Sequence, residues 1–428
     1  MKFDTVIIGG GLTGLISGIR LMQKGQKCAI ISSGQSALHF FSGSFDLLNN
    51  LPDGTPVNNP EASLLELSKQ APNHPYVKMG ESKFTELAQK AKSFLTEIGI
   101  KTQGCSHKNH YRITPMGMIK PTWLTMSNFA FFEVGKFPWK KAAIINIEGF
   151  LDFNPDFISE AFEKIGVETS IAYFNLPELN LIRKNPSEFR STNLSFVLDK
   201  EVNQDLLVKI LSEKSQGCEL IIFPDCIGFR NADLLPGLIN RLGKPIYLIP
   251  TFPPSLVGVS TQLYLKDYFT KLGGVFMLGD NATHADIEGN QVTNLYTLNH
   301  GNIPISAKNV ILSSGSFFSQ GLLADIKQVY EPVFDLDTDY LTDRADWYNS
   351  NLFEKQNYQQ FGVKTDKNFH GIKNDTPIDN LYVAGAILSG FNPLKEGCGA
   401  GVSFLSALYV AEQILIKEKT YEPIAQYK

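Results

Sequence analysis

The chain has 428 residues, of which 43% are hydrophobic and 19% are charged, as in an ordinary soluble globular protein with room for two or three domains. Its formal net charge of −4 offers no basic field for nucleic acid. Because no run of about 18 apolar residues occurs and the N-terminus lacks a cationic leader, we expect an intracellular protein with no transmembrane segment of its own. The five cysteines are scattered and never spaced as Cys-x-x-Cys, so we expect no metal or iron–sulfur site within this chain.

The start of the chain has the pattern of a β-α-β unit. A short apolar run over residues 3–8 leads directly into a Gly-x-Gly-x-x-Gly turn, then into an amphipathic stretch, and a second apolar run follows over residues 28–31. Gly9 allows the tight turn, Gly11 lets the backbone approach a phosphate, and Gly14 lets helix and strand pack closely. The free N–H groups of the helix then face an anion, which predicts a nucleotide-type cofactor.

The end of the second strand departs from the usual dinucleotide pattern. A carboxylate often stands there to bind the adenosine ribose, whereas this chain has Ser32 and Ser33. Either an adenosine is held by other groups, or the cofactor is FMN, which would place only its terminal phosphate at the helix. The segment 34–44 that follows is rich in small and hydroxyl residues, so it could donate hydrogen bonds to a flavin. A surface loop is the alternative, and we favour the cofactor role.

The middle of the chain reads as an inserted α/β domain over residues 106–254, between two parts of a discontinuous flavin-binding domain, 1–105 and 255–428. Helical stretches separate its expected strands, and prolines between residues 250 and 254 mark the return to the first domain. The expected strands are residues 142–147, 170–174, 219–223 and 246–249.

The last third returns to cofactor-binding patterns. A helix over 260–272 is followed by turn signals that predict a β-meander, and the strand at 308–313 ends in Ser314-Gly315. A strand at 380–384 runs into a glycine turn, and a second glycine-rich segment opens an apolar helix over 402–416. That helix would aim its positive end at a flavin pyrimidine, although a C-terminal packing helix with a flexible lead-in is the alternative.

These patterns together predict a Rossmann-like α/β flavoprotein fold, with a parallel sheet, a β-meander, surrounding helices and an inserted α/β domain. The residues expected to contact the flavin come from both ends of the chain. They are Gly9, Gly11, Leu12, Thr13, Gly14, Ser32, Ser33, Ser42, Gly43, Ser44, Ser314, Gly315, Gly385, Ala386, Gly397, Gly399, Ala400, Gly401 and Val402.

Several strings in the chain are more specific than the glycine turn, above all Gly-Gln-Ser-Ala-Leu-His-Phe at 34–40. With these strings the chain resembles the flavoproteins of the fumarate reductase and glycerol-3-phosphate dehydrogenase type, and more closely the B subunits of the anaerobic, quinone-linked glycerol-3-phosphate dehydrogenases. The likeness covers nearly the whole chain. The segments that carry it are 3–14, 34–40, 315–318 and 397–399, with support from 51–54, 253–255 and 360–366.

The resemblance implies oxidation of sn-glycerol 3-phosphate to dihydroxyacetone phosphate in anaerobic glycerol catabolism. It implies FMN on this chain, with FAD as the alternative, and it implies as partner an FAD-bearing catalytic A subunit. A third, iron–sulfur C subunit would dock the pair peripherally on the inner face of the cytoplasmic membrane and pass electrons to the quinone pool for fumarate or nitrate respiration. Ser32, and Ala386 where an acid is common, fit FMN, but the missing carboxylate at Ala386 weakens the flavin anchor.

An alcohol dehydrogenation needs a base, and histidine suits it because its pKa lies near neutrality. His39 is the candidate, since it lies in the predicted flavin loop. A substrate phosphate is bound by basic side chains. Arg112 and Lys120 are the candidates, with Arg183 and Arg190 as alternatives.

Three functions remain open for such a chain. It could share the substrate site of a dehydrogenase, it could transfer electrons through its flavin without a substrate site, or it could be a degenerate flavoprotein fold kept for assembly. An NAD-linked reductase fits less well, because no second Gly-x-Gly-x-x-Gly occurs.

Overall fold

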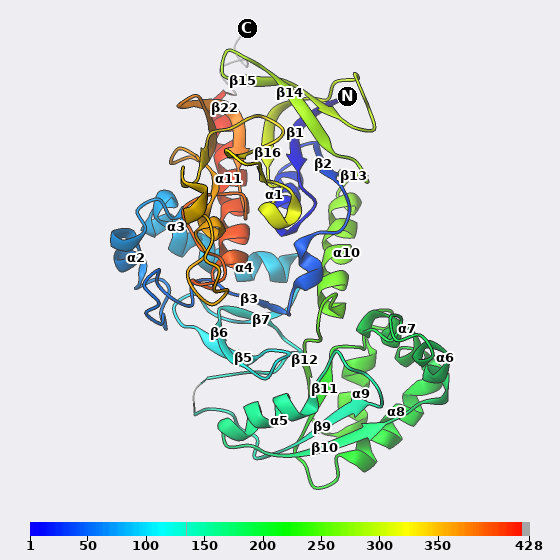
Figure 1. The fold of residues 1–428 in the computed structure, drawn as a ribbon. Helices are drawn as coiled ribbons and strands as arrows, with labels where there is room; N and C mark the ends of the chain where they lie inside the picture. Colours follow the sequence, from blue (N-terminus) through cyan, green and yellow to red (C-terminus); the bar gives the residue numbers. More distant parts are fainter. Residues whose placement is uncertain (134, 422–428) are drawn as a thin grey trace.

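The computed structural model describes residues 1–133 and 135–421 and has a six-stranded main sheet, which lies in the upper part of the view in Figure 1. Five strands run parallel and the last, at one edge, is antiparallel. The central strands are near-continuous apolar runs, as expected where helices and loops cover both faces of a parallel sheet. In sheet order they are β13 (Val275–Leu278), β2 (Cys28–Ser32), β1 (Lys2–Ile8), β16 (Ser306–Leu312), β22 (Thr376–Val383) and β21 (His370–Lys373).

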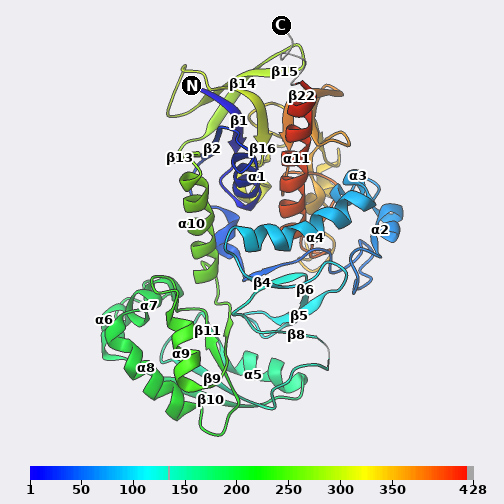
Figure 2. The same cartoon turned by 180° about the vertical axis from the view of Figure 1, so that it is seen from behind.

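Helices α1 (Leu12–Met22), α10 (Leu256–Lys271) and α11 (Gly399–Tyr421) pack side by side on this sheet, and α4 (Glu81–Glu97) crosses α11 (Figures 1 and 2). Gly18 lies where α1 meets α10, because a Cβ there would be 2.9 Å from the ring of Phe269. The predicted Rossmann-like α/β fold with a parallel sheet is therefore confirmed.

The helix α11 is apolar on nearly every side. Its length and mean hydropathy of 1.5 would also suit a membrane-spanning helix, although the sequence was expected to hold none. In this structure 61% of that helical window is buried, and Phe404 is fully buried among Phe45, Phe94 and Trp123. The apolar surface of α11 therefore belongs to the protein core, which is what a helix that is hydrophobic all round is expected to do in a large domain.

The inserted part has a parallel sheet and a hydrophobic core of its own (Figure 1). All four predicted strands are present, in the order β10 (Glu168–Phe174), β9 (Lys141–Ile147), β11 (Leu220–Pro224) and β12 (Ile246–Ile249). The helices of this part are α5 (Pro155–Lys164), α6 (Asn180–Arg183), α7 (Ser191–Leu198), α8 (Glu201–Lys214) and α9 (Leu234–Leu242).

Small antiparallel sheets lie between the two parts (Figure 2). The strand β7 (Leu124–Met126) falls inside the predicted insertion, yet it pairs with β3 (Ser44–Phe45) and β4 (Thr102–Gly104), and Trp123 lies in the main core. A second small sheet joins β6 (Ile119–Thr122), β5 (His110–Ile113) and β8 (Phe131–Phe132).

The predicted β-meander is a two-stranded hairpin, because its first strand, β13, joins the main sheet instead. The hairpin pairs β14 (Ala282–Glu288) with β15 (Gln291–Thr297). The remaining elements are α2 (Leu64–Gln70), α3 (Pro75–Met79), β17 (Leu323–Ala324), β18 (Val329–Tyr330), β19 (Thr338–Asp339), β20 (Gly362–Val363) and five short 3₁₀ turns, of which η1 (Ala37–Phe40) concerns the site.

Replacing Phe404 with alanine is expected to lower the free energy of unfolding by about 3–5 kcal/mol, because it leaves a cavity among aromatic rings that the structure cannot refill. The matched control is Phe353→Ala, whose ring is 95% exposed and whose loss should change stability by no more than about 0.5 kcal/mol. Urea denaturation followed by circular dichroism measures both. Equal losses for the two variants would contradict this placement of α11.

Candidate functional site

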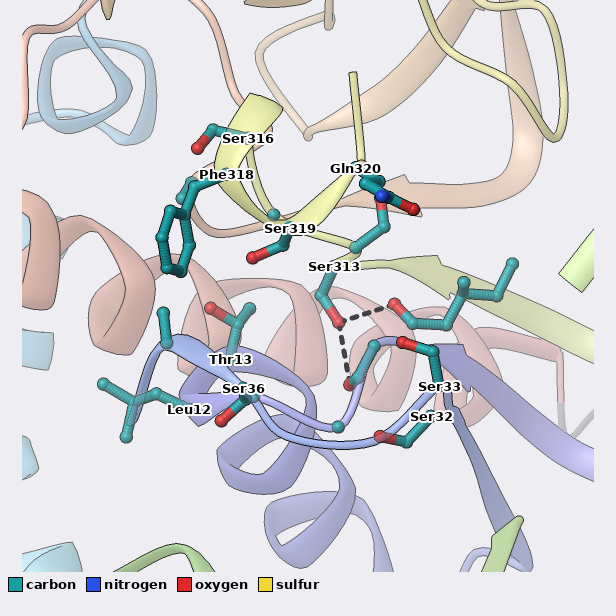
Figure 3. A pocket seen from close by; sticks show the side chains of 18 of the residues that line it. Leu12, Thr13, Ser32, Ser33, Ser36, Ser313, Ser316, Phe318, Ser319 and Gln320 are labelled. Carbon is teal, nitrogen blue, oxygen red and sulfur yellow. Dashed lines mark hydrogen bonds between the residues drawn. The ribbon is translucent and has the colours of Figure 1, made fainter. Parts of the chain in front are cut away.

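A pocket of about 580 Å³ lies at the carboxyl ends of the parallel strands of the main sheet (Figure 3). This edge is where ligands bind in open α/β sheets, because helix N-termini and strand-end loops converge there. The pocket is lined by the glycine turn after β1, by Ser32 and Ser33 after β2, by residues 280–282 after β13 and by residues 313–316 after β16. Its far side is closed by Ala386 and the first turn of α11.

The glycine turn brings three backbone segments closer than any side chain would permit. A Cβ on Gly9 would lie 2.2 Å from the carbonyl oxygen of Ser313, and a Cβ on Gly14 would lie 1.9 Å from that of Gly9. The hydroxyl of Ser313 donates a 3.0 Å hydrogen bond to the Ile8 carbonyl, which ties β16 to β1 at this point (Figure 3).

Gly11 has a different role, because a Cβ there would meet only Ser36 at 3.7 Å. Its absence leaves space in front of the first turn of α1, whose N–H groups have no intrahelical acceptor. Leu12 and Thr13 line the pocket from this turn (Figure 3). A phosphate approaching here would meet several aligned N–H donors and the positive end of the helix.

The first turn of α11 faces the other end of the pocket. Gly399, Ala400 and Ser403 line it, and the Thr13 hydroxyl donates to the Ser403 carbonyl at 3.2 Å. A Cβ on Gly385 would lie 2.4 Å from the Thr13 hydroxyl, so the strand end of β22 also packs against the start of α1. Two helix N-termini, from opposite ends of the sequence, are therefore brought to one pocket.

Hydroxyl and amide side chains give the rest of the lining its polar character, and two phenylalanines stand at its edge. Phe40 and Phe318 are 56% and 67% exposed, and their rings meet edge to face at 5.2 Å. Such an apolar edge beside a polar floor suits a cofactor with a flat ring and a polar chain. The polar lining includes Gln35 and, as Figure 3 shows, Ser36, Ser313, Ser316, Ser319 and Gln320.

Asp280, which no sequence pattern singles out, also lines the pocket. Burial raises the pKa of its carboxyl, but hydrogen bonds from the Asn299 N–H, Thr297, the Asn281 N–H and His300 outweigh burial and leave the pKa below its ordinary value. Asp280 follows β13, which pairs with β2 so that Leu278 lies opposite Ser32. The strand-end rule would have found Asp280 once β13 was assigned to the main sheet.

The structure sorts the predicted flavin residues into two groups. Eleven of them line the pocket, namely Gly9, Gly11, Leu12, Thr13, Ser32, Ser33, Ser314, Gly315, Ala386, Gly399 and Ala400. The other eight do not line the pocket. They are Gly14, Ser42, Gly43, Ser44, Gly385, Gly397, Gly401 and Val402.

In the hydroxyl-rich segment 34–44, only residues 35–38, 40 and 41 line the pocket. Ser44 has entered β3, where its hydroxyl lies 3.3 Å from that of Thr125 on β7. Gly43 packs against the ring of Phe129, 3.2 Å from the position of its missing Cβ. Residues 42–44 therefore join the flavin loop to the small sheet beneath it.

His39, the predicted base, lies between two lining residues but is not itself among those that line the pocket. Burial lowers the pKa of His39, and a hydrogen bond with Gln262 of α10 opposes part of that shift. The lowered pKa favours the neutral ring near pH 7, which is the form that accepts a proton.

Arg112 and Lys120, the predicted phosphate ligands, are brought together on neighbouring strands, where both face Asp46. Arg183 and Arg190 instead lie in the inserted part, where Arg183 bonds to Asn175 and Arg190 pairs with Asp152. The structure thus groups Arg112 and Lys120 at one carboxylate and leaves the second pair apart, and none of the four lines the pocket.

A buried group of potential metal ligands, His74, Glu396 and Cys398, lies just before α11. The Tyr76 N–H donates to His74 Nδ1 at 3.0 Å, so the ring proton belongs on Nε2, which lies 3.1 Å from the Glu396 carboxylate. A metal at Nε2 would have to displace this proton. The group is better described as a hydrogen-bonded support that holds the glycine-rich start of α11 in place.

Gly11→Ala is expected to fold normally but to bind flavin at least about tenfold more weakly, because charge-assisted hydrogen bonds to phosphate are worth about 1.5–3 kcal/mol. The backbone at Gly11 has φ −84°, which alanine adopts freely. Flavin fluorescence titration of the stripped protein measures the affinity.

The matched variant Gly14→Ala should instead lower the free energy of unfolding by about 1–3 kcal/mol, because its Cβ collides with backbone. Urea denaturation without flavin measures this loss. Normal flavin affinity in Gly11→Ala would show that no anion approaches this turn.

Comparisons with known proteins identify the family of this chain. The sequence matches the FAD binding domain family over residues 4–402. It is 49% identical to the B subunit of the anaerobic glycerol-3-phosphate dehydrogenase of Yersinia enterocolitica over 97% of this chain and 98% of that protein, and 42% identical to its counterpart in Pectobacterium atrosepticum over 97% and 99%. Among solved structures, 3-ketosteroid Δ1-dehydrogenase from Sterolibacterium denitrificans aligns with a TM-score of 0.49 at 10% identity, over 97% of this chain and 100% of that one. The chain belongs to the FAD binding domain family and, within it, to the anaerobic glycerol-3-phosphate dehydrogenase B subunits.

Proposed function

We propose that this chain binds one flavin in the pocket between α1 and α11 and works in a complex that oxidises sn-glycerol 3-phosphate to dihydroxyacetone phosphate. The observation that carries the proposal is the meeting of two helix N-termini at one pocket, in a chain that matches the B subunits over nearly their whole length. The first turn of α1 would hold the flavin phosphate, and the first turn of α11 would lie at the pyrimidine.

Oxidation of the secondary alcohol removes one proton from the hydroxyl and one hydride from the carbon that bears it. A bound flavin supplies the two-electron acceptor for the hydride. The protein must orient the alcohol and accept the proton. His39 is the proposed acceptor because it lies between the pocket-lining residues Leu38 and Phe40 and its lowered pKa favours the neutral ring. The neutral ring is then available over the physiological pH range.

FMN is the proposed flavin. Ser32, at the usual place of the ribose carboxylate, uses its hydroxyl to donate to the Gly34 carbonyl, 3.2 Å away. The carboxylate of Asp280 at the same end of the pocket is already engaged by Asn281, Asn299 and His300. Both groups are therefore already hydrogen-bonded within the protein, which leaves neither for an adenosine ribose. An FMN phosphate needs only the first turn of α1.

Cofactor release by heat, followed by chromatography and mass measurement, is expected to give FMN at about one per chain. This tests the finer part of the proposal, because FAD at the same stoichiometry would mean that other groups hold the ribose. Ser32→Asp adds the missing carboxylate, and it should leave FMN affinity unchanged if no adenosine is present.

The proposed partners are an FAD-bearing catalytic A subunit and an iron–sulfur C subunit, and the latter would hold the other two chains at the cytoplasmic face of the membrane. Electrons would leave through the iron–sulfur partner to the quinone pool, for fumarate or nitrate respiration. Support for a complex comes from the matched relatives, each of which is the B subunit of a dehydrogenase.

Addition of sn-glycerol 3-phosphate to the anaerobic complex is expected to bleach the absorbance of the flavin on this chain. The same addition to the chain alone separates two functions. Bleaching there would place a substrate site on this chain, whereas bleaching only with the FAD-bearing partner present would make the chain an electron-transfer subunit. No bleaching of this chain's flavin in either sample would contradict the proposal.

If His39 accepts the proton, kcat/KM should fall as pH drops through its pKa, which lies below the ordinary value of about 6.5. Protonation on the acid side removes the acceptor, so activity is retained above this pKa. His39→Gln should abolish that acidic limb and lower kcat by about 10²–10⁴-fold. The exposed His284 of the hairpin gives the control variant His284→Gln, and an unchanged pH profile in His39→Gln would exclude His39.

A further inference from the structure

Two basic side chains stand directly opposite each other on the small sheet beneath the pocket. Arg112 of β5 and Lys120 of β6 are paired across the antiparallel strands, so their side chains share one face. Like charges in such a pair repel each other and need an anion nearby. Asp46 supplies part of this negative charge, because Lys120 Nζ lies 3.0 Å and Arg112 Nη2 lies 3.9 Å from its Oδ2.

We call Asp46, Arg112 and Lys120 the Asp46 cluster. Among the described residues, several polar atoms of this cluster have no hydrogen-bond partner. Arg112 is only 7% exposed, and its Nε and Nη1 have no hydrogen-bond partner among the described residues. The buried Oδ1 of Asp46 has none among them either. Unpaired groups of this kind are costly when buried, so the cluster calls for a ligand that accepts hydrogen bonds at Arg112 and donates one at Asp46.

The cluster lies next to the start of α11, the helix whose first turn lines the pocket. The Gly401 N–H, in the first turn of α11, donates a 2.9 Å hydrogen bond to the Asp46 carbonyl. Ala400 and Ser403, on either side of Gly401, line the pocket. The ring of Phe45, next to Asp46, packs at 4.8 Å against that of Phe41, which also lines the pocket. The cluster therefore lies against the helix start that lines the pocket, although its own three residues are not among the lining residues.

We propose that the Asp46 cluster is the binding site, called the seat below, of a phosphorylated polyol. Arg112 and Lys120 would bind the phosphate, and Asp46 would accept a hydrogen bond from a hydroxyl. The two cations and one carboxylate leave an excess of positive charge, which suits a phosphate monoester. An uncharged polyol would leave the positive charge of Arg112 without a counter-ion. This inference rests on the proposed function, because it assigns the substrate site to this chain.

The test compares steady-state kinetics of the assembled complex carrying Arg112→Gln with those of the wild type. KM for sn-glycerol 3-phosphate should rise at least about tenfold while flavin content stays the same, since charge-assisted contacts to phosphate are lost. The inhibition constant of inorganic phosphate should rise in parallel. Arg241→Gln, which removes an exposed arginine paired with Asp205 in the inserted part, is the matched control.

Asp46→Asn separates the two halves of the seat, because it should raise KM for the phosphorylated polyol without weakening inhibition by inorganic phosphate. If Arg112→Gln does not fold, Lys120→Gln replaces it, since that side chain is 38% exposed. Unchanged KM and phosphate inhibition in a folded variant overturn the proposal.

Failure of the proposed function is distinguishable from failure of the seat. If the wild-type complex does not oxidise sn-glycerol 3-phosphate, calorimetric titration of the flavin-loaded chain with inorganic phosphate and with sn-glycerol 3-phosphate tests the seat alone. Binding of both that weakens in Arg112→Gln supports the seat, and no binding to the wild-type chain overturns it.

Discussion

The close backbone contact among β1, β16 and α1 is the constraint on which the rest of this structure depends. Gly9 lies against the Ser313 carbonyl, and Gly14 lies against Gly9, so a Cβ at either glycine would push helix and strands apart. Closing this contact sets the first turn of α1 at the carboxyl edge of the sheet. The pocket is the space left in front of that turn, which is why its anion-binding character follows directly from the packing.

The second helix at the pocket comes from the far end of the sequence. Thr13 links the start of α1 to Ser403 of α11, and Gly385 packs against the same threonine. The buried bond between His74 and Glu396 holds the segment that leads into α11. The inserted part has its own core, so the long stretch of chain between the two halves of the main sheet does not disturb this geometry. A flavin site built in this way needs both ends of the chain to be folded.

Local patterns predict the backbone of the site well, because the glycine turn and the glycine-rich start of α11 each stand in a recognisable order of strand, turn and helix. The strand, turn and helix at residues 3–22 and the glycine-rich start of α11 were predicted from neighbouring residues alone. Asp280 and the polar segment 316–320 were not, since they reach the pocket through sheet order and irregular loops that no periodicity encodes. Ser44 was misplaced because a hydroxyl residue reads equally well as a flavin contact and as a strand residue paired with β7.

The most direct test of this account is an experimental structure of the chain with its flavin bound. The account predicts the phosphate within hydrogen-bond distance of the backbone N–H groups at Leu12 and Thr13. It also predicts the pyrimidine edge of the ring against the first turn of α11, beside Ala400. Density for the flavin elsewhere, for example on the sheet of the inserted part, would contradict the account, and so would a ring turned away from α11.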